Sequence, residues 1–221
     1  MDDDLDELVR RVDPDRWLAS RFVQDPGLRA EVVAVYAFDH ELGRAPRVAS
    51  SPLLGEMRLT WWREALDEIY EGRTVRRHPT AEALAAAVQR HHLAREILEA
   101  MIDARYRELD ASPMTETEAL DWARDSAGRA AEAAARILDP AAKAELAQAP
   151  GAVWALGRRL PEQPELRPAF ERVLTTAKTA VRMIGVPAFP AVAHAVLAGR
   201  PNPSEFAKRW RLTLAVARGK I

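Results

Sequence analysis

Carboxylates spaced one helical turn apart are the residues of this chain most suited to chemistry. Glu64 lies four residues before Glu68, and Asp67 lies four before Glu71, all in one polar stripe. Oxygen ligands one turn apart on a helix can converge on a hard divalent cation such as Mg²⁺. The alternative is a solvated helix face whose charge is tempered by Arg63. The spacing alone favours the solvated face.

A second carboxylate pair has the same spacing. Asp121 and Asp125 are one turn apart, and Gly128 follows them. Glycine inside a helix costs about 1 kcal/mol relative to alanine, so it often marks a close approach by another helix or a ligand. A magnesium site for a diphosphate needs clusters on two facing helices. No acid pair four residues apart follows Asp139, so a two-cluster magnesium site is hard to assemble in this chain. If such a site exists, its candidate ligands are Asp121, Asp125, Glu64 and Glu68.

Other catalytic arrangements are missing from the sequence. There is no glycine-rich phosphate loop, no Gly-x-Ser-x-Gly turn and no His-x-x-x-His pair. His92 and Glu96 are four apart but lack a third nearby ligand, so we interpret them as a helix junction. The chain has no cysteine, which excludes disulfides, thiolate nucleophiles and sulfur-bound metals.

The elements that must position these residues are helices. Alanine, leucine, glutamate and arginine dominate, and alternating β-branched residues are hard to find, which predicts an all-α protein. In residues 58–72, Leu59, Trp62, Leu66 and Ile69 form one apolar stripe. The final residue of that stretch is a glycine, which predicts a left-handed helix end there.

Capping residues, prolines and periodicity set the expected boundaries. Asp15 and Thr80 are predicted N-caps, Thr115 with Glu118 forms a predicted capping box, and Pro46 is expected to end its helix. A loop is expected at residues 50–52. We predict one domain spanning residues 1–221, with helices at about 3–12, 15–22, 28–42, 58–72, 80–90, 94–109, 116–137, 141–160, 166–184, 190–197 and 204–217.

The overall charge balance points to no nucleic-acid partner. There are 32 basic and 33 acidic residues, for a formal net charge of -1. Residues 200–221 carry six bases and one acid, so this segment is a candidate for contact with an anionic membrane surface, the alternative being a basic helix face in water. The acidic N-terminus argues against a secretion signal, and no apolar run reaches membrane-spanning length. We expect a cytoplasmic protein, with peripheral membrane contact left open.

Several stretches, taken in order, resemble the squalene/phytoene synthase family. These are residues 15–22, 35–38 and 52–66, together with the Ala127-Gly128 step, and the most specific element is Trp61-Trp62-Arg63. The resemblance covers about residues 15–138. It implies a helical bundle of the isoprenoid (terpenoid) synthase type around a central cavity, shortened at the C-terminal end. The candidates for cavity or ligand contact are Tyr36, Phe38, Asp39, Arg44, Arg47, Arg58 and Trp62.

The resemblance also implies where magnesium should bind in active members, on two aspartate-rich motifs. The first falls on Gly43, Arg44 and Arg47 of this chain, and the second falls on residues 151–161, which contain no aspartate. Arginine keeps its charge and repels a metal ion. Both halves of the metal site are therefore expected to be lost. In this the chain is similar to non-synthase members such as a mitochondrial factor for respiratory complex I assembly.

Three functional hypotheses follow. The first is a catalytically degenerate protein that needs no cofactor and binds a partner protein or an isoprenoid-type lipid, with Arg44 and Arg47 either holding a phosphate or forming a solvated helix end. The second is an active transferase that condenses two prenyl diphosphates, with Mg²⁺ held by Asp121, Asp125 and the Glu64/Glu68 face. The third is a structural helical subunit whose core is filled.

Overall fold

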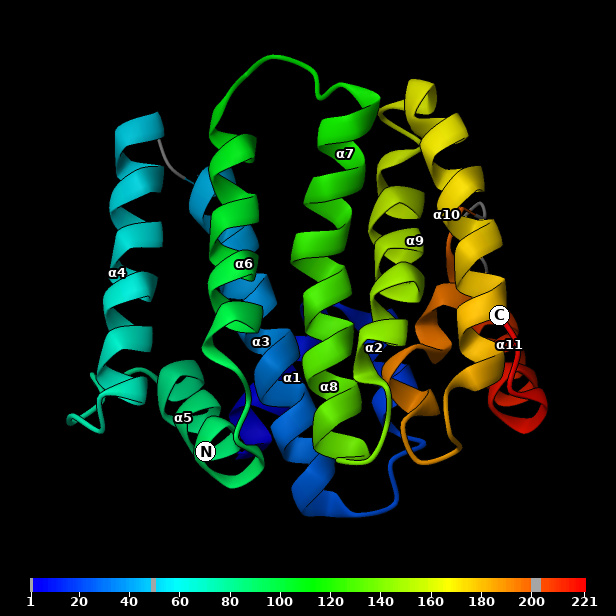
Figure 1. Cartoon of the computed structure of the whole chain (residues 1–221), viewed down its shortest axis with the longest axis horizontal. Coiled ribbons are helices and arrows are strands. Elements are labelled where there is room, and N and C mark those ends of the chain that lie inside the picture. The colour runs from blue at the N-terminus through cyan, green and yellow to red at the C-terminus, as the bar shows by residue number, and fades with distance from the viewer. Residues whose placement is uncertain (1, 49–50, 200–203) are drawn as a thin grey trace.

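The computed structural model describes residues 2–48, 51–199 and 204–221 and is built from helices, with no strand in those ranges (Figure 1). The longest helices stand side by side, and α4 and α11 lie at opposite edges. Short 3-10 helices connect several of them. The α-helices are α1 Asp2–Val12, α2 Pro14–Ser20, α3 Pro26–Val48, α4 Pro52–Tyr70, α5 Pro79–His91, α6 Arg95–Tyr106, α7 Glu116–Ala123, α8 Arg129–Leu138, α9 Gln148–Arg159, α10 Arg167–Ala180 and α11 Glu205–Arg218.

Proline fixes where four helices begin. α2, α3, α4 and α5 each start at a proline, whose missing N–H costs nothing in a first turn. The predicted N-caps Asp15 and Thr80 are therefore wrong, because each lies inside the first turn, while Asp13 and His78 occupy the cap positions. The helix expected from residue 58 starts earlier, at Pro52, for the same reason.

Pro46 does not end its helix, contrary to the prediction. α3 continues through it to Val48. Leu42 and Ala45 are fully buried in this last stretch, and their packing outweighs the backbone cost of the proline. Of the loop expected at residues 50–52, residue 50 lies outside the described residues, and Ser51 is the N-cap of α4.

Other predicted boundaries are confirmed. Thr115 and Glu118 form the capping box in both directions. Gly72 follows the C-cap of α4 with a φ of 68°. The helix expected at 116–137 runs from α7 to α8 through a π-helical turn, Arg124–Gly128. The C-terminal third differs, since the segment expected as a helix at 190–197 forms two short 3-10 helices.

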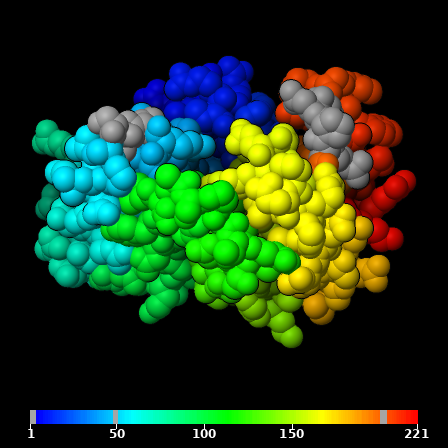
Figure 2. Space-filling model, turned by 90° about the horizontal axis from the view of Figure 1, so that it is seen from above, coloured from blue at the N-terminus to red at the C-terminus, as the bar shows by residue number. Residues whose placement is uncertain are grey.

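Two groups of helices each build a hydrophobic cluster. The larger cluster takes residues from α1 to α6 and α8, and the smaller takes residues from α7, α9 and α10. Figure 2 looks onto the end of the bundle that is uppermost in Figure 1 and shows the surface hollowed between the blue and cyan N-terminal segments and the yellow segment. The single-domain assignment stays a prediction.

The π-helical turn and α9 meet backbone to backbone at two glycines. A Cβ on Gly151 would lie 2.4 Å from the carbonyl oxygen of Ala127, and a Cβ on Gly128 would lie 2.9 Å from that of Gln148. The glycine expected to mark a close approach therefore marks one by another helix. This crossing fixes α9 against the central helix. Within the described ranges, no helix combines the length and apolar character needed to cross a membrane.

We predict that Gly151→Ala lowers the free energy of unfolding by about 1–3 kcal/mol, because the added methyl group forces the two backbones apart. Urea denaturation followed by circular dichroism measures this. The control is Gly27→Ala at the exposed start of α3, whose new methyl group would meet only the exposed side-chain carboxylate of Asp25, at 3.1 Å. The control should stay within about 0.5 kcal/mol of the unmodified protein. Equal stability of Gly151→Ala and the unmodified protein would contradict the close crossing.

Candidate functional site

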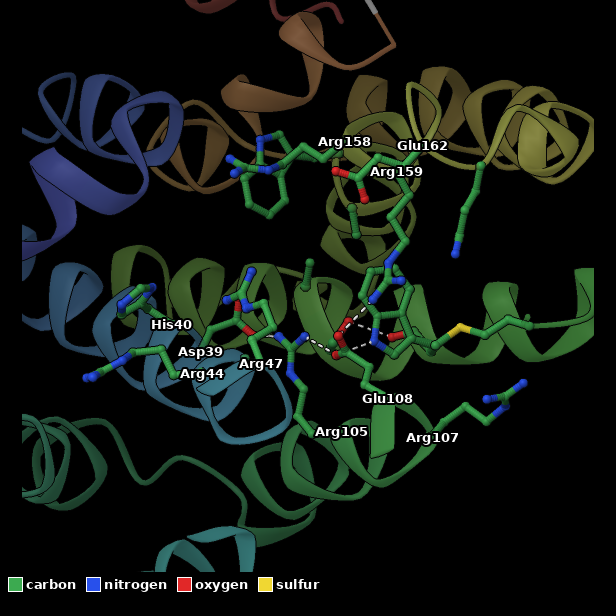
Figure 3. A pocket seen from close by; sticks show the side chains of 18 of the residues that line it. Asp39, His40, Arg44, Arg47, Arg105, Arg107, Glu108, Arg158, Arg159 and Glu162 are labelled. Atoms are coloured by element: carbon green, nitrogen blue, oxygen red, sulfur yellow. Dashed lines mark hydrogen bonds and ion pairs between the residues drawn. The ribbon is translucent and has the colours of Figure 1, made fainter. Parts of the chain in front are cut away.

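A cavity of about 870 Å³ lies where the helices of the two hydrophobic clusters face each other. Its walls come from α3, α6 with the following 3-10 helix, the α7 region and α9 (Figure 3). Charged side chains dominate the polar lining, and aromatic and small apolar residues make up much of the rest. The lining arginines are Arg44, Arg47, Arg105, Arg107, Arg158 and Arg159, and the lining acids are Asp13, Asp39, Glu108, Asp110 and Glu162.

A chain of buried ion pairs runs along one wall. Asp39 on α3 accepts hydrogen bonds from Arg16 Nη1 at 2.7 Å and from Arg105 Nη2 at 2.5 Å. Arg105 also donates to Glu108 at 2.6 Å, and Glu108 accepts a further bond from Arg159 at 2.7 Å. The Trp122 indole N–H donates to Glu108 at 2.8 Å. This series of ion pairs and hydrogen bonds thus connects α2, α3, α6, α7 and α9.

These contacts set the protonation states of the carboxylates. Burial acts to raise the pKa of Asp39, but Arg105 and Arg16 outweigh it and lower the pKa to about 2. Burial also opposes ionisation of Glu108, and Arg105 and Arg159 again outweigh it, so that its pKa is lowered. Both groups are therefore anionic at neutral pH. A carboxylate with a depressed pKa and its oxygens held by guanidiniums is a poor general base.

Two arginines at the cavity differ from the rest. Within the described residues, Arg47 takes part in no ion pair, and the nearest carboxylate to Arg158 is Asp13, at 3.9 Å. Partial burial lowers the pKa of Arg47, and the neighbouring cations Arg105 and Arg158 act in the same direction, whereas the charge of Glu108 opposes the shift. Arg158 lies over the Trp154 ring, 4.8 Å from its centroid. Figure 3 shows Arg47 and Arg158 on different walls of the cavity.

Gly43 makes room for this arrangement. A Cβ at this position would lie 2.9 Å from Arg47 Nη2 and 3.6 Å from the guanidinium carbon of Arg105. The missing side chain therefore lets two guanidiniums approach the same turn of α3. The cavity wall is cationic at the position where the sequence comparison expected metal-binding carboxylates.

The structure separates the candidate residues named from the sequence. Asp39, Arg44 and Arg47 line the cavity. Arg58 and Trp62 line a smaller groove of about 210 Å³, which shares Arg44 with the cavity.

Two further candidates, Tyr36 and Phe38, line neither hollow. Tyr36 is buried beside Arg16, whose guanidinium carbon lies 5.1 Å from the ring centroid. Phe38 packs edge-on against Trp62 in the core, with 5.2 Å between their ring centroids. Tyr36 and Phe38 pack in the core next to residues of the site and do not line the cavity.

The four carboxylates named as alternative metal ligands are engaged elsewhere. Glu64 and Glu68 both pair with Arg76, at 3.3 Å and 2.7 Å. Hydrogen bonds from Arg76 lower the pKa of Glu68 to about 2. The other two, Asp121 and Asp125, pair with Arg124 at 2.9 Å and 2.7 Å, and neither lines the cavity.

The donor set of the cavity does not fit a magnesium ion. Mg²⁺ requires several free oxygen ligands in octahedral geometry, whereas the oxygens of Asp39 and Glu108 accept bonds from arginines and a tryptophan. In the ranges that the structure describes, no three His, Cys, Asp or Glu side chains gather as a metal site would. His92 and Glu96, interpreted as a helix junction, lie at one, because His92 is the left-handed C-cap of α5 and Glu96 is in the first turn of α6.

Several residues of the cavity and of the ion-pair network behind it were not found from the sequence. Arg105 and Glu108 are three apart on adjoining helical turns, a spacing that could have flagged an ion pair. Arg158 and Arg159 lie in the stretch searched only for aspartate. Arg16 lies in residues 15–22, one of the stretches that resemble the family, but it was not predicted to contact the cavity. Nothing local in the sequence indicates that these residues meet.

The fold and this cavity define the class of protein as a helical bundle of the isoprenoid synthase type. The family model described as squalene/phytoene synthase matches residues 9–160. The chain belongs to the squalene/phytoene synthase family. The resemblance identified from the sequence is therefore confirmed, together with the all-α fold.

Solved structures support the fold. A dehydrosqualene synthase in complex with ligand superposes with a TM-score of 0.74 at 14% identity, covering 98% of this chain and 95% of that one. Squalene synthase HpnC from Alicyclobacillus acidocaldarius gives a TM-score of 0.70 at 14% identity, covering 99% and 94%. At this identity, the likeness concerns the fold alone.

Similar curated proteins point to a different branch of the family. The bovine (Bos taurus) protein "NADH dehydrogenase (ubiquinone) complex I, assembly factor 6" is 33% identical over 104 residues, 47% of this chain. The human (Homo sapiens) protein of the same name is 32% identical over the same length. The match spans 31% of the length of each of these relatives.

We predict that Asp39→Asn lowers the free energy of unfolding by about 3–5 kcal/mol, because it removes the buried carboxylate shared by Arg16 and Arg105. Only Asp13, 3.5 Å from Arg16, and Glu108, 2.6 Å from Arg105, then remain to balance the two guanidiniums. Urea denaturation at neutral pH measures the change. The matched control is Asp121→Asn, which removes a half-exposed partner of Arg124 and should cost less than about 1 kcal/mol. Similar losses for the two variants would refute the structural importance of the buried carboxylate.

The stability of the protein should also fall in acid. The pKa of Asp39 is lowered in the folded state from 3.8 to about 2, so its contribution is fully present above the unfolded-state value and is lost as pH falls toward the folded-state value. Unfolding free energies measured from pH about 5 to about 2 should show this loss, and Asp39→Asn should show less of it. An identical pH slope for the variant would contradict the assignment.

Proposed function

We propose that this chain is a catalytically degenerate member of its family that binds an isoprenoid-type lipid with an anionic head, without magnesium-dependent catalysis. The observation that carries the proposal is the set of charges at the cavity. Its carboxylates Asp39 and Glu108 are each held by arginines, whereas Arg47 lacks a carboxylate partner in the described residues and Arg158 has only a distant one.

The chemistry of the cavity suits a phosphorylated lipid. Guanidinium groups donate two parallel hydrogen bonds to phosphate oxygens, and Arg47 and Arg158 can supply them without a bridging metal. Trp122, Trp154 and Met114 offer apolar surface for a hydrocarbon tail. The volume of about 870 Å³ lies within the usual range of small-molecule sites, roughly 300–1,000 Å³. A purely structural subunit with a filled core would lack such a space.

A partner protein is the second candidate. The relatives that match 47% of this chain are named as assembly factors of complex I, and those names favour a role in protein association. We infer that lipid binding and association with a protein are compatible, because the cavity occupies only one end of the bundle. A cytoplasmic, membrane-peripheral location belongs to the same proposal.

The remaining alternative is an active transferase that condenses two prenyl diphosphates. It would need Mg²⁺ on Asp121, Asp125, Glu64 and Glu68. Arg124 and Arg76 would have to release these carboxylates first. The proposal of metal-free binding requires no such rearrangement.

Ligand binding can be measured by calorimetry with farnesyl diphosphate in the presence of a chelator. We expect binding without metal, and Arg47→Ala and Arg158→Ala should each weaken it about 10- to 100-fold, since a hydrogen bond to a charged group contributes about 1.5–3 kcal/mol. Arg77→Ala serves as the control, because this exposed arginine lies outside the cavity lining. Binding that needs Mg²⁺, or variants with unchanged affinity, would refute the proposal.

Catalysis can be tested separately. Incubation with farnesyl or geranylgeranyl diphosphate and Mg²⁺ should yield no coupled hydrocarbon product, because Asp39 and Glu108 at the cavity are held by arginines. Product analysis by mass spectrometry checks this. Formation of coupled product that is abolished by Asp121→Ala would support the transferase alternative instead.

A further inference from the structure

Helix α11 presents two large aromatic side chains to solvent. Phe206 is 78% exposed and Trp210 is 57% exposed, and they lie one turn apart on the same face. The opposite face is buried through Leu212 and Ala215. The helix is therefore already attached to the bundle by one side, and its outer aromatic side contributes nothing to the core.

The inner attachment of α11 is specific. Lys208 is buried, and its Nζ lies 3.1 Å from the carboxylate of Asp15 on α2. Together with Leu212 and Ala215, this ion pair fixes the rotation of the helix about its own axis. The exposure of Phe206 and Trp210 is thus set by the packing of the opposite face.

Cations surround the outer face. Residues 204–221 contain five bases and a single acid, Glu205. Arg209, Arg218 and Lys220 are exposed, and no ion pair involves any of them within the described ranges. Among the residues that the structure describes, Glu205 forms an ion pair only with Lys208, at 3.7 Å. The outer face is therefore both aromatic and positively charged.

We propose that α11 docks this protein on an anionic membrane surface, with Phe206 and Trp210 inserted at the head-group level and Arg209, Arg218 and Lys220 against the lipid phosphates. Exposed aromatics flanked by bases are the features of a helix lying in the plane of the interface. Tryptophan favours this depth because its ring is apolar and its N–H is polar. Each base near an anionic surface adds about 1 kcal/mol of attraction.

The charge pattern favours a bilayer over a protein partner for this face. The fully buried centre of a protein interface is depleted in charged residues, whereas here bases lie beside the aromatics and beyond the last turn of α11. Helix α11 also lies at an edge of the bundle, where a flat surface can approach it (Figure 1). No residue of α11 lines the cavity, so this inference does not depend on lipid binding there.

Vesicle flotation tests the proposal with the full chain. The protein should float with vesicles of phosphatidylcholine mixed with phosphatidylglycerol, and not with phosphatidylcholine alone. High salt should release it, because the Debye length falls from about 10 Å at 0.1 M to about 3 Å at 1 M. Absence of flotation with the anionic vesicles at low salt, or equal flotation with both kinds, overturns the proposal.

Variants locate the contact. Neutralising Arg209, Arg218 and Lys220 together to glutamine should weaken partitioning about 100-fold, and Phe206→Ala with Trp210→Ala should weaken it about tenfold or more. The matched controls neutralise the exposed bases Arg77, Lys143 and Lys178, or truncate the exposed Leu53 and Met57 of α4.

The controls should bind as the unmodified protein does. Thermal unfolding should be unchanged in every variant, since all the altered side chains are exposed. Equal losses in the α11 variants and the controls would overturn the assignment to α11, and the lipid and salt dependence of the unmodified protein stands as a test without any variant.

Discussion

The buried carboxylate of Asp39, held between Arg16 and Arg105, is the interaction on which the rest of the cavity depends. Isolating a charge from water is expensive unless partners satisfy it, and here one aspartate is bound by guanidiniums from α2 and α6. Arg105 also pairs with Glu108, and Glu108 pairs with Arg159 on α9. Four separate segments of the chain are thereby fixed around one hollow.

This network has a chemical consequence for the cavity. The two buried carboxylates at its centre, Asp39 and Glu108, are engaged with arginines, and their depressed pKa values keep them charged. What remains available is positive charge, chiefly on Arg47 and Arg158. A cavity with these properties can bind and orient an anion, but it has little means of activating one. That distinction is the physical basis for proposing binding without catalysis.

The cavity and the outer face of α11 carry their positive charge in different settings. In the cavity, Arg47 is partly buried among other cations, so an anion gains from low solvation and fixed geometry. On α11, Arg209, Arg218 and Lys220 remain in water and act on a surface through a long-range field that salt weakens. A protein with both features would hold a membrane-derived ligand close to its source.

The sequence by itself determined the helical fold, the family and the ends of some helices, because these follow from local periodicity, capping and contiguous motifs. Thr115 with Glu118, Gly72 and the Trp61-Trp62 stretch are such local signals. It failed at Pro46, where burial of the preceding turn overrides the local preference of proline.

Only the tertiary structure decided which charges meet. Arg16, Asp39, Arg105 and Arg159 are separated by long stretches of chain, and the partner of each is set by how the helices pack and not by its neighbours in sequence. The same holds for Tyr36 and Phe38, which the sequence placed in the cavity and packing placed behind it. Pairing energies of this kind act across space, so spacing along the chain cannot reveal them.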